Sequence, residues 1–213
     1  MALRARNPGV DELREALAQI ADTTRQLNAR VTELLAFARG EEDAMTLILE
    51  RCDLRHVVAS AVDSLRARAE MQQLQLTQCL PEQPCMINAD PARLQQLVQV
   101  LLDNALRYTP PGGRVGVDIG PVVLPSGVLG FELSVTDTGI GLVEAERPLL
   151  FDRHFRGSNA RLFRPDGVGL GLPIAQTIAQ AHGAQLVLHS QPDGGTQAVL
   201  PMAQAEPNPA AAA

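Results

Sequence analysis

The fold is decided by residues 97–110, which read LVQVLLDNALRYTP. Together with Leu94, the apolar residues of this stretch recur at helical spacing, which predicts an amphipathic helix packed on a core. Asn104 falls inside the apolar stretch, near the end of the helix. A buried amide without a hydrogen bond costs roughly 1–3 kcal/mol, so Asn104 is either a satisfied core residue or a ligand for a metal ion or phosphate. The helix alone favours the first interpretation.

The residues around this helix carry boundary signals. Asp90-Pro91 supplies an N-cap and a proline at the first helical position, and Pro110 to Gly113 stops the helix. Further upstream, Asp53 is expected to cap a helix from Leu54 to about Glu70. Short strands are expected at 45–51 and 74–80, and a turn at 81–84 leads to a returning strand at 85–88.

The second half of the chain predicts strands, one helix and a long loop. Strands are expected at 115–119, 131–136, 185–190 and 196–201, and a helix from Pro173 to about His182. The second of these strands leads directly into Asp137-Thr138-Gly139-Ile140-Gly141. Residues 142–166 hold few periodic apolar positions and many charges. A loop of this length inside a compact domain is typical of a lid or a binding loop.

Composition narrows the class of protein. The chain has 213 residues, of which 46% are hydrophobic and 3% aromatic, so an aliphatic core is expected. Its net charge of −6 argues against a nucleic-acid binder that relies on broad electrostatic attraction. The three cysteines lack the spacing of a zinc site and are expected to be reduced thiols. No apolar run is long enough to span a bilayer.

The N-terminal part predicts a separate helix. Its apolar seam has alternating spacings of four and three over almost four heptads, which favours a coiled-coil or bundle partner over packing on its own domain. The seam consists of Leu13, Leu17, Ile20, Thr24, Leu27, Val31, Leu34 and Ala38. Gly40 and the acidic residues after it mark a boundary. The Ala- and Pro-rich end of the chain is expected to be disordered.

Two glycine-rich stretches could hold a ligand. Asp137 follows a strand and can accept a hydrogen bond from an exocyclic amine, while Gly139 and Gly141 allow a flat ring to approach the backbone. The alternative is an ordinary turn with a capping aspartate. Residues 167–171, which read GVGLG, precede a helix whose free N–H groups suit phosphate. Each signal is weak alone, but the ordered set could bind the base, phosphates and metal of one nucleotide.

The same stretches resemble the four nucleotide-binding boxes of sensor histidine kinases, in family order. Residues 102–110 (LDNALRYTP) resemble the N box and 137–141 (DTGIG) the G1 box. Residues 151–157 (FDRHFRG) resemble the F box, and 167–172 (GVGLGL) the G2 box. The resemblance extends from about Asp11 to Met202. It implies the α+β fold of the gyrase, MutL and histidine-kinase ATPases, a two-layer α/β sandwich preceded here by a long N-terminal helix.

The resemblance also implies a division of the chain and a role for each site residue. Residues 1–40 would be the second helix of a dimerisation hairpin, 41–202 the catalytic ATP-binding domain and 203–213 a disordered tail. Asn104 would coordinate Mg²⁺, and Asp137 would accept from the adenine amino group. The remaining nucleotide contacts would come from Arg107, Tyr108, Gly139, Gly141, Arg156, Gly167, Gly169, Leu170 and Gly171. Of these, Arg107 and Arg156 would be the catalytic cations at the phosphates.

The chain departs from the family pattern at several positions. Val100 stands where many members have a second asparagine, and His154 replaces the second phenylalanine of the F box. Asp166 stands where the G2 box has its leading glycine, and Val168 replaces a frequent Thr or Ser. None of the four histidines has the sequence context of a phosphoacceptor; they are His56, His154, His182 and His189.

These observations lead to one main hypothesis and two alternatives. The chain is expected to bind ATP and Mg²⁺ and to donate the γ-phosphate to a histidine that it lacks, so that it does not phosphorylate itself. Its partners would be a response regulator and a second copy, with no nucleic acid. The fragment would be cytoplasmic, and a membrane-bound parent would reside in the bacterial inner membrane. The alternatives are an ATPase or serine kinase on the same fold, and an interaction module with a degenerate nucleotide pocket.

Overall fold

The computed structural model describes residues 46–206, so the expected heptad helix lies outside the described residues. No helix within this range is both long and apolar enough to cross a bilayer. The elements follow in the order β1 (Glu50–Asp53), α2 (Leu54–Met71), β2 (Gln75–Cys79), β3 (Met86–Ala89), α3 (Pro91–Tyr108), β4 (Arg114–Val123), β5 (Leu129–Asp137), η1 (Glu144–Leu149), α4 (Ser158–Phe163), α5 (Gly171–Ala181), β6 (Val187–Ser190) and β7 (Thr196–Ala203).

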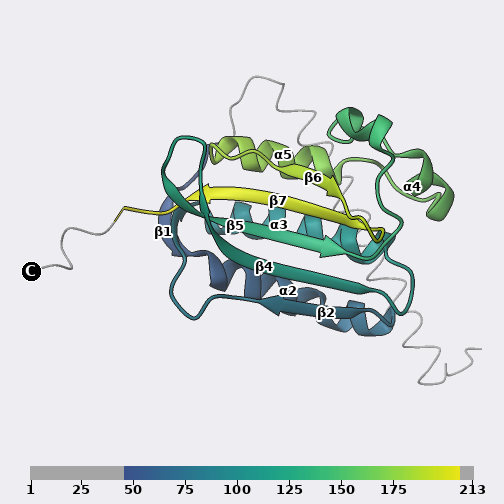
Figure 1. Cartoon of the computed structure of the whole chain (residues 1–213), viewed down its shortest axis with the longest axis horizontal. Coiled ribbons are helices and arrows are strands. Elements are labelled where there is room, and N and C mark those ends of the chain that lie inside the picture. Colours follow the sequence, from purple (N-terminus) through teal and green to yellow (C-terminus); the bar gives the residue numbers. More distant parts are fainter. Residues whose placement is uncertain (1–45, 207–213) are drawn as a thin grey trace, which may run out of the picture. The chain divides into compact units, whose positions relative to one another are not determined.

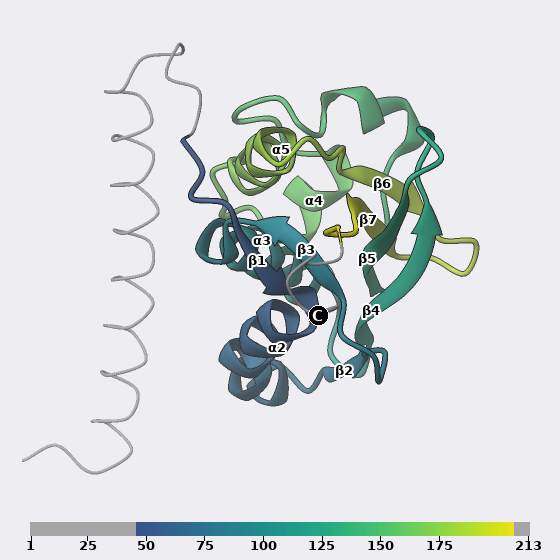
Figure 2. The same cartoon turned by 90° about the vertical axis from the view of Figure 1, so that its left-hand side faces the viewer.

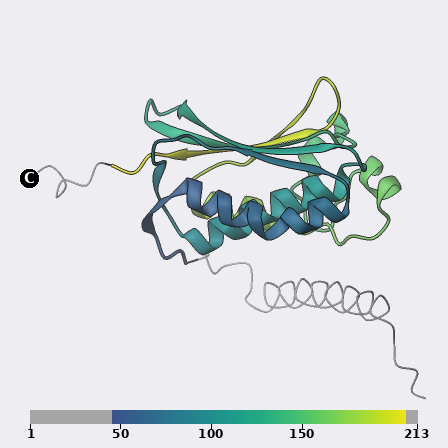
Figure 3. The same ribbon diagram turned by 90° about the horizontal axis from the view of Figure 1, so that it is seen from below.

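The described part of the chain has two layers. Five strands form one mixed sheet in the order β2-β4-β5-β7-β6, in which β2 runs parallel to β4 and the other neighbours are antiparallel. Helices α2, α3 and α5 cover one face of this sheet (Figures 1 and 3). Strands β1 and β3 form a separate antiparallel pair. The two-layer α/β sandwich expected from the sequence is therefore confirmed.

The helix boundaries follow from their caps, and the core is aliphatic as predicted. The carboxylate of Asp53 accepts from the Arg55 N–H at 3.1 Å, and that of Asp90 from the Arg93 N–H at 3.0 Å. Both predicted N-caps are confirmed. The largest fully buried side chains are Leu54, Val58, Val62, Ile87, Leu94, Leu97, Leu102, Leu106, Leu133, Ile178, Leu186 and Leu200.

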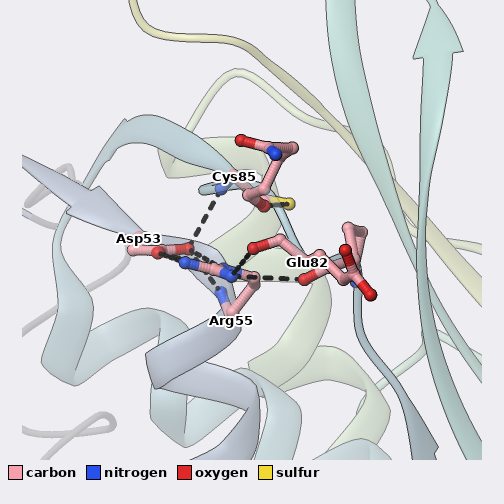
Figure 4. A network of polar contacts seen from close by, with 6 residues as sticks. Asp53, Arg55, Glu82 and Cys85 are labelled. Atoms are coloured by element: carbon pink, nitrogen blue, oxygen red, sulfur yellow. Dashed lines mark hydrogen bonds and ion pairs between the residues drawn. The ribbon is translucent and has the colours of Figure 1, made fainter.

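The predicted hairpin between 74–80 and 85–88 is wrong, although both segments are strands. Strand β3 pairs with β1, and β2 pairs with β4 (Figure 2). The connection contains two prolines, which have no N–H to donate to a ladder. Instead the guanidinium of Arg55 donates to the carbonyls of Pro81 and Glu82, and the Asp53 carboxylate accepts from the Cys85 N–H (Figure 4). These bonds attach the connection to the start of α2, so it does not form a hairpin turn back to β2.

Several other boundaries differ from the prediction by a few residues, and three of them have a clear physical reason. Strand β4 continues through Pro121, because β2 pairs with it only as far as Asp118 and a proline beyond that point interrupts no β2 ladder. Helix α5 begins at Gly171, two residues before Pro173, because proline is tolerated in a first turn whose N–H groups are unpaired anyway. Strand β1 begins only at Glu50, where its partner β3 ends at Ala89.

Ordered structure also extends beyond the predicted domain end at Met202. Strand β7 includes Ala203, and Ala205 is buried, with its N–H bonded to the Met86 carbonyl at 2.8 Å. The sequence did not predict this extension of β7, because alanine and proline have low strand propensity. In the predicted long loop, two short elements are present, η1 and α4, and neither contains a buried residue. Between them, Leu150 is buried in the core and Phe151 and Phe155 pack against it, so apolar contacts anchor the middle of this segment and polar contacts shape the rest.

A histidine joins the far ends of α3 and α5. The Asp90 N–H donates to Nε2 of His182 at 3.0 Å, and Nδ1 of the same ring lies 2.8 Å from the Ile178 carbonyl. A neutral ring with its proton on Nδ1 satisfies both contacts. The carboxylate of Asp90 also accepts from the Ile48 N–H. Asp90 thus joins α3, α5 and the segment that precedes β1.

We expect His182→Leu to lower the free energy of unfolding by about 1–2 kcal/mol, because the buried Asp90 N–H then loses its acceptor. His182→Gln should lose less, since its amide oxygen can accept from the same N–H. Urea unfolding measures both. The matched control is His189→Leu at an exposed position of β6, which should change stability by less than about 0.5 kcal/mol. Equal effects at the two histidines would contradict the assignment.

Candidate nucleotide-binding site

Asp137 is the last residue of β5 and carries a buried carboxylate with one oxygen bonded inside the protein. Its side chain is buried, with 8% of the residue exposed. Oδ1 accepts from the Gly139 N–H at 2.8 Å and from the Thr196 N–H at 3.2 Å. No described residue donates to Oδ2. One carboxylate oxygen is therefore held in place by the backbone, and the other can accept a hydrogen bond from a ligand.

Burial also changes the acidity of this group. Desolvation raises the pKa of Asp137 from its ordinary value of 3.8 to about 6, against the opposing effect of the two backbone hydrogen bonds. Above pH 6 the carboxylate is charged and accepts strongly. Because a buried charge costs free energy, the ionised Asp137 lowers the free energy of unfolding. Residues whose pKa is strongly shifted in this way are common at functional sites.

Glycines make room for this carboxylate. A Cβ built on Gly195, whose φ is +94°, would collide with the Asp137 carbonyl, and one built on Gly139 would collide with the Tyr108 carbonyl. The Ile140 N–H bonds to that same Tyr108 carbonyl at 3.1 Å. The G1 segment therefore lies directly against the end of α3. This contact brings Asp137 and the N-box residues to one end of the sheet.

Asn104 lies one turn before the end of α3 and faces the start of α5. Its amide is half-buried and makes no hydrogen bond within residues 46–206. A Cβ built on Gly171 would lie 3.4 Å from its Nδ2 and 3.6 Å from its Oδ1, and 3.3 Å from Val100. The sequence predicted a buried amide that is either satisfied or a ligand. The structure gives a partly exposed one with its polar atoms available, which fits the second interpretation.

The start of α5 offers backbone donors. Leu170 precedes the helix and no side chain caps it, so the first N–H groups remain available. Gly169, with φ +76°, lies so close to the F-box backbone that a Cβ there would be 2.7 Å from the Phe155 carbonyl. Its own carbonyl accepts from the His154 N–H at 2.9 Å. The G2 and F boxes are therefore one connected unit, although His154 replaces an aromatic residue of the family pattern.

The two predicted phosphate-binding arginines both contact the lid, which we define as residues 142–170. Arg107 on α3 forms an ion pair with Asp166 at 2.8 Å and also donates to the Asp166 carbonyl. The guanidinium of Arg156 donates to carbonyls of the lid itself, namely those of Ala160, Arg164, Pro165 and Gly167. In this arrangement Arg156 organises the lid backbone.

Sequence reasoning missed three contributors to the site. Thr196 and Gly195 belong to a turn that was interpreted only as a hairpin connection, yet this turn supplies an N–H to Asp137 and leaves space for it. Asn159 on α4 donates from its Nδ2 to the Gly141 carbonyl at 2.8 Å and so joins the lid to the G1 segment. No local pattern marks these residues, because their role depends on contacts distant in sequence.

Comparison with known proteins identifies the family. Residues 89–205 match the family described as Histidine kinase-, DNA gyrase B-, and HSP90-like ATPase. The chain belongs to this ATPase family. The match covers more than half of the 213 residues and includes all four boxes.

Named relatives place the chain among the sensor histidine kinases within this family. It is 31% identical over 186 residues to the histidine-protein kinase/phosphatase MprB of Mycolicibacterium vanbaalenii, covering 87% of this chain and 36% of that protein. It is 30% identical to the sensor histidine kinase YkoH of Bacillus subtilis (92% and 40%) and 28% identical to the sensory kinase SasA of a Nostoc strain (87% and 44%). The chain spans less than half the length of these relatives and corresponds to their ATP-binding catalytic region.

Solved structures of sensor histidine kinases have the same fold as this chain. The mycobacterial sensor histidine kinase MprB superposes with a TM-score of 0.62 at 29% identity, covering 74% of this chain and 98% of that one. Full-length ShkA, solved in complex with AMPPNP, superposes with a TM-score of 0.70 at 22% identity, over 95% of this chain and 41% of that one, and supports the fold. The kinase region of this chain therefore has the fold that the resemblance implied.

The charge state of Asp137 gives a stability prediction. Below its ordinary pKa of 3.8 the carboxyl is protonated in folded and unfolded chains alike, whereas between pH 3.8 and 6 only the unfolded chain ionises freely, so stability falls as pH rises through this window. We expect Asp137→Asn, which keeps the oxygen that accepts from Gly139 and Thr196, to raise the free energy of unfolding at pH 7 by about 1–3 kcal/mol.

Urea unfolding without nucleotide at pH 5 and pH 7 tests this prediction, and the gain should be smaller at pH 5. The control is Asp118→Asn, which removes an exposed carboxylate from β4 and should give less than about 0.5 kcal/mol at either pH. A loss of stability in Asp137→Asn, or a gain that does not depend on pH, would contradict the burial argument.

Proposed function

We propose that this chain binds ATP with Mg²⁺ and transfers the γ-phosphate to a histidine outside the described residues. The observation that carries the proposal is the shared location of two unsatisfied polar groups. The free oxygen of Asp137 and the amide of Asn104 lie at the same end of the sheet, linked through the end of α3. A buried carboxylate oxygen without a donor suits an exocyclic amine such as that of adenine.

The residues at this end of the sheet divide into two groups. Asp137 would accept from the adenine amino group, while Gly139 and Gly141 leave room for the ring and Tyr108 packs near it. On the phosphate side, Gly167 would leave space for the backbone, and the N–H groups of the α5 start would bind phosphate oxygens. The donors of that start are Gly169, Leu170 and Gly171. Two cations would act on this side, Arg107 and Arg156, each after exchanging its present contacts with the lid.

The residues present fit a magnesium ion that is bound mainly by the nucleotide. Among residues 46–206 no group of three or more acidic, His or Cys side chains could hold a metal alone. Mg²⁺ commonly uses one or two protein oxygens together with phosphates and water. The amide oxygen of Asn104 would be that protein ligand, with Val100 in the place of a second one. Bound Mg²⁺ would neutralise negative charge that develops on the phosphates during transfer.

The protein's own contribution to transfer would be positioning and electrostatics. Phosphoryl transfer needs an in-line acceptor and cationic stabilisation and little covalent chemistry from the enzyme. The acceptor histidine would come from a dimerisation hairpin, of which residues 11–39 resemble the second helix. Further partners in this proposal are a response regulator and a second copy of the chain. The placement of a longer parent in the bacterial inner membrane stays a prediction.

Nucleotide titration tests the binding step. Asp137→Asn should weaken both ATP and adenosine by about 10- to 100-fold, because a hydrogen bond to a charged acceptor contributes about 1.5–3 kcal/mol. Asn104→Ala should remove the increase in ATP affinity caused by Mg²⁺ and leave adenosine unchanged. The matched control is Gln99→Ala, which removes an amide on the same helix whose partner among residues 46–206 is the Ser64 hydroxyl. Unchanged ATP affinity in both site variants would remove the assignment.

Phosphotransfer in trans tests the second step. With Mg-ATP and a separate dimerisation hairpin that carries a phosphoacceptor histidine, the full chain should label the hairpin with acid-labile phosphate, and it should not label itself. The controls are Asn104→Ala and a hairpin whose acceptor histidine is replaced by glutamine. Acid-stable label on serine, or release of free phosphate without transfer, would favour the serine kinase or ATPase alternative.

A further inference from the structure

Two arginines hold the last part of the lid. The carbonyls of Arg164, Pro165 and Gly167 accept from the Arg156 guanidinium, and the carbonyl of Asp166 accepts from Arg107. Every carbonyl from 164 to 167 is therefore bound by a guanidinium. This segment lies immediately before the backbone donors at the start of α5, so its position decides how the phosphate side of the site is closed.

Within this segment, Asp166 supplies the negative side chain, and Arg164 is the other charged residue. Its Oδ2 lies 2.8 Å from Nη2 of Arg107, and the same Nη2 also contacts the Asp166 carbonyl. Arg107 is three residues after Asn104 on α3, and residues at this spacing are neighbours on a helix surface. A negative side chain from the lid thus neutralises the cation closest in sequence to the proposed metal ligand.

Exposure limits the strength of this pair. The Asp166 side chain is 72% exposed and that of Arg107 is 29% exposed. Ion pairs of this kind are worth about 0.2–1 kcal/mol. A triphosphate carries more negative charge than one carboxylate, so it can displace Asp166 from Arg107. The contact therefore adjusts phosphate affinity and does not block the site.

We propose that Asp166 is an internal competitor of the nucleotide phosphates for Arg107. Without nucleotide, its carboxylate neutralises Arg107 and holds the lid on α3. When phosphate binds, Arg107 exchanges the carboxylate for phosphate oxygens and the lid segment loses this attachment. Asp166 does not compete for Arg156, whose partners in the described part of the chain are uncharged carbonyls. The inference rests on the proposed function and specifies how that same site is regulated.

The test compares affinities for ATP and adenosine in the full chain, measured by isothermal titration. Asp166→Asn should bind ATP about two- to fivefold more tightly, the change that corresponds to loss of one exposed ion pair. Adenosine has no phosphate and should bind with unchanged affinity. The gain should largely disappear in an Arg107→Gln background, since the competition needs the arginine.

Asp152→Asn is the matched control. It removes the same charge from the same lid at an exposed position, and no hydrogen bond or ion pair of its carboxylate occurs within residues 46–206. An equal gain in this control would assign the effect to general charge and overturn the inference, as would unchanged or weaker ATP binding in Asp166→Asn. A gain of full size in the Arg107→Gln background would also overturn it. Absence of ATP and adenosine binding in the unaltered chain would instead reject the proposed function.

Discussion

The structure of this site depends on the burial of a carboxylate at the end of β5. Removing Asp137 from water raises its pKa and costs stability, and the surrounding backbone is arranged to limit that cost. Two N–H groups hold one oxygen, and they come from two different segments, the G1 segment and the start of β7. Both approaches require glycine, at 139 and 195, because a Cβ would collide with backbone atoms. The packing around the carboxylate thus requires a glycine in each of two segments that are distant in the chain.

The parts of the molecule that could be predicted from sequence are those that depend on residues close together in the chain. Helices α2 and α3 combine a capping aspartate with apolar periodicity, so their starts were predicted correctly. The glycine boxes follow local rules of the same kind. Strand pairing does not: whether β3 returns to β2 or joins β1 depends on Arg55 binding the carbonyls of the connection (Figure 4). The roles of Thr196 and Asn159 could not be predicted for the same reason, since their partners lie 59 and 18 residues away.

The lid contributes Leu150 to the hydrophobic core, but its two short helical elements keep a defined shape without burying a residue. Neither η1 nor α4 contains a buried residue, so hydrophobic packing contributes little to their position. Hydrogen bonds take its place: Asn159 bonds to the G1 segment, the Ser158 N–H donates to Glu146, and Arg156 gathers carbonyls of the lid. Such contacts are individually weak in water. A ligand that offers alternative partners can therefore rearrange the lid at modest cost, which packed helices would resist.

Helices α3 and α5 differ from the lid in this respect. They pack in the core, and at the end remote from the site His182 joins them through Asp90. Near the site the start of α5 lies close to α3, since a Cβ built on Gly171 would be 3.3 Å from Val100 and 3.4 Å from the Asn104 amide. The polar groups on these two helices are thus held at a nearly constant separation. Changes on nucleotide binding should then fall on lid residues 156–170, which contribute no side chain to the core cluster. The charged contact between these residues and α3 is the one between Asp166 and Arg107.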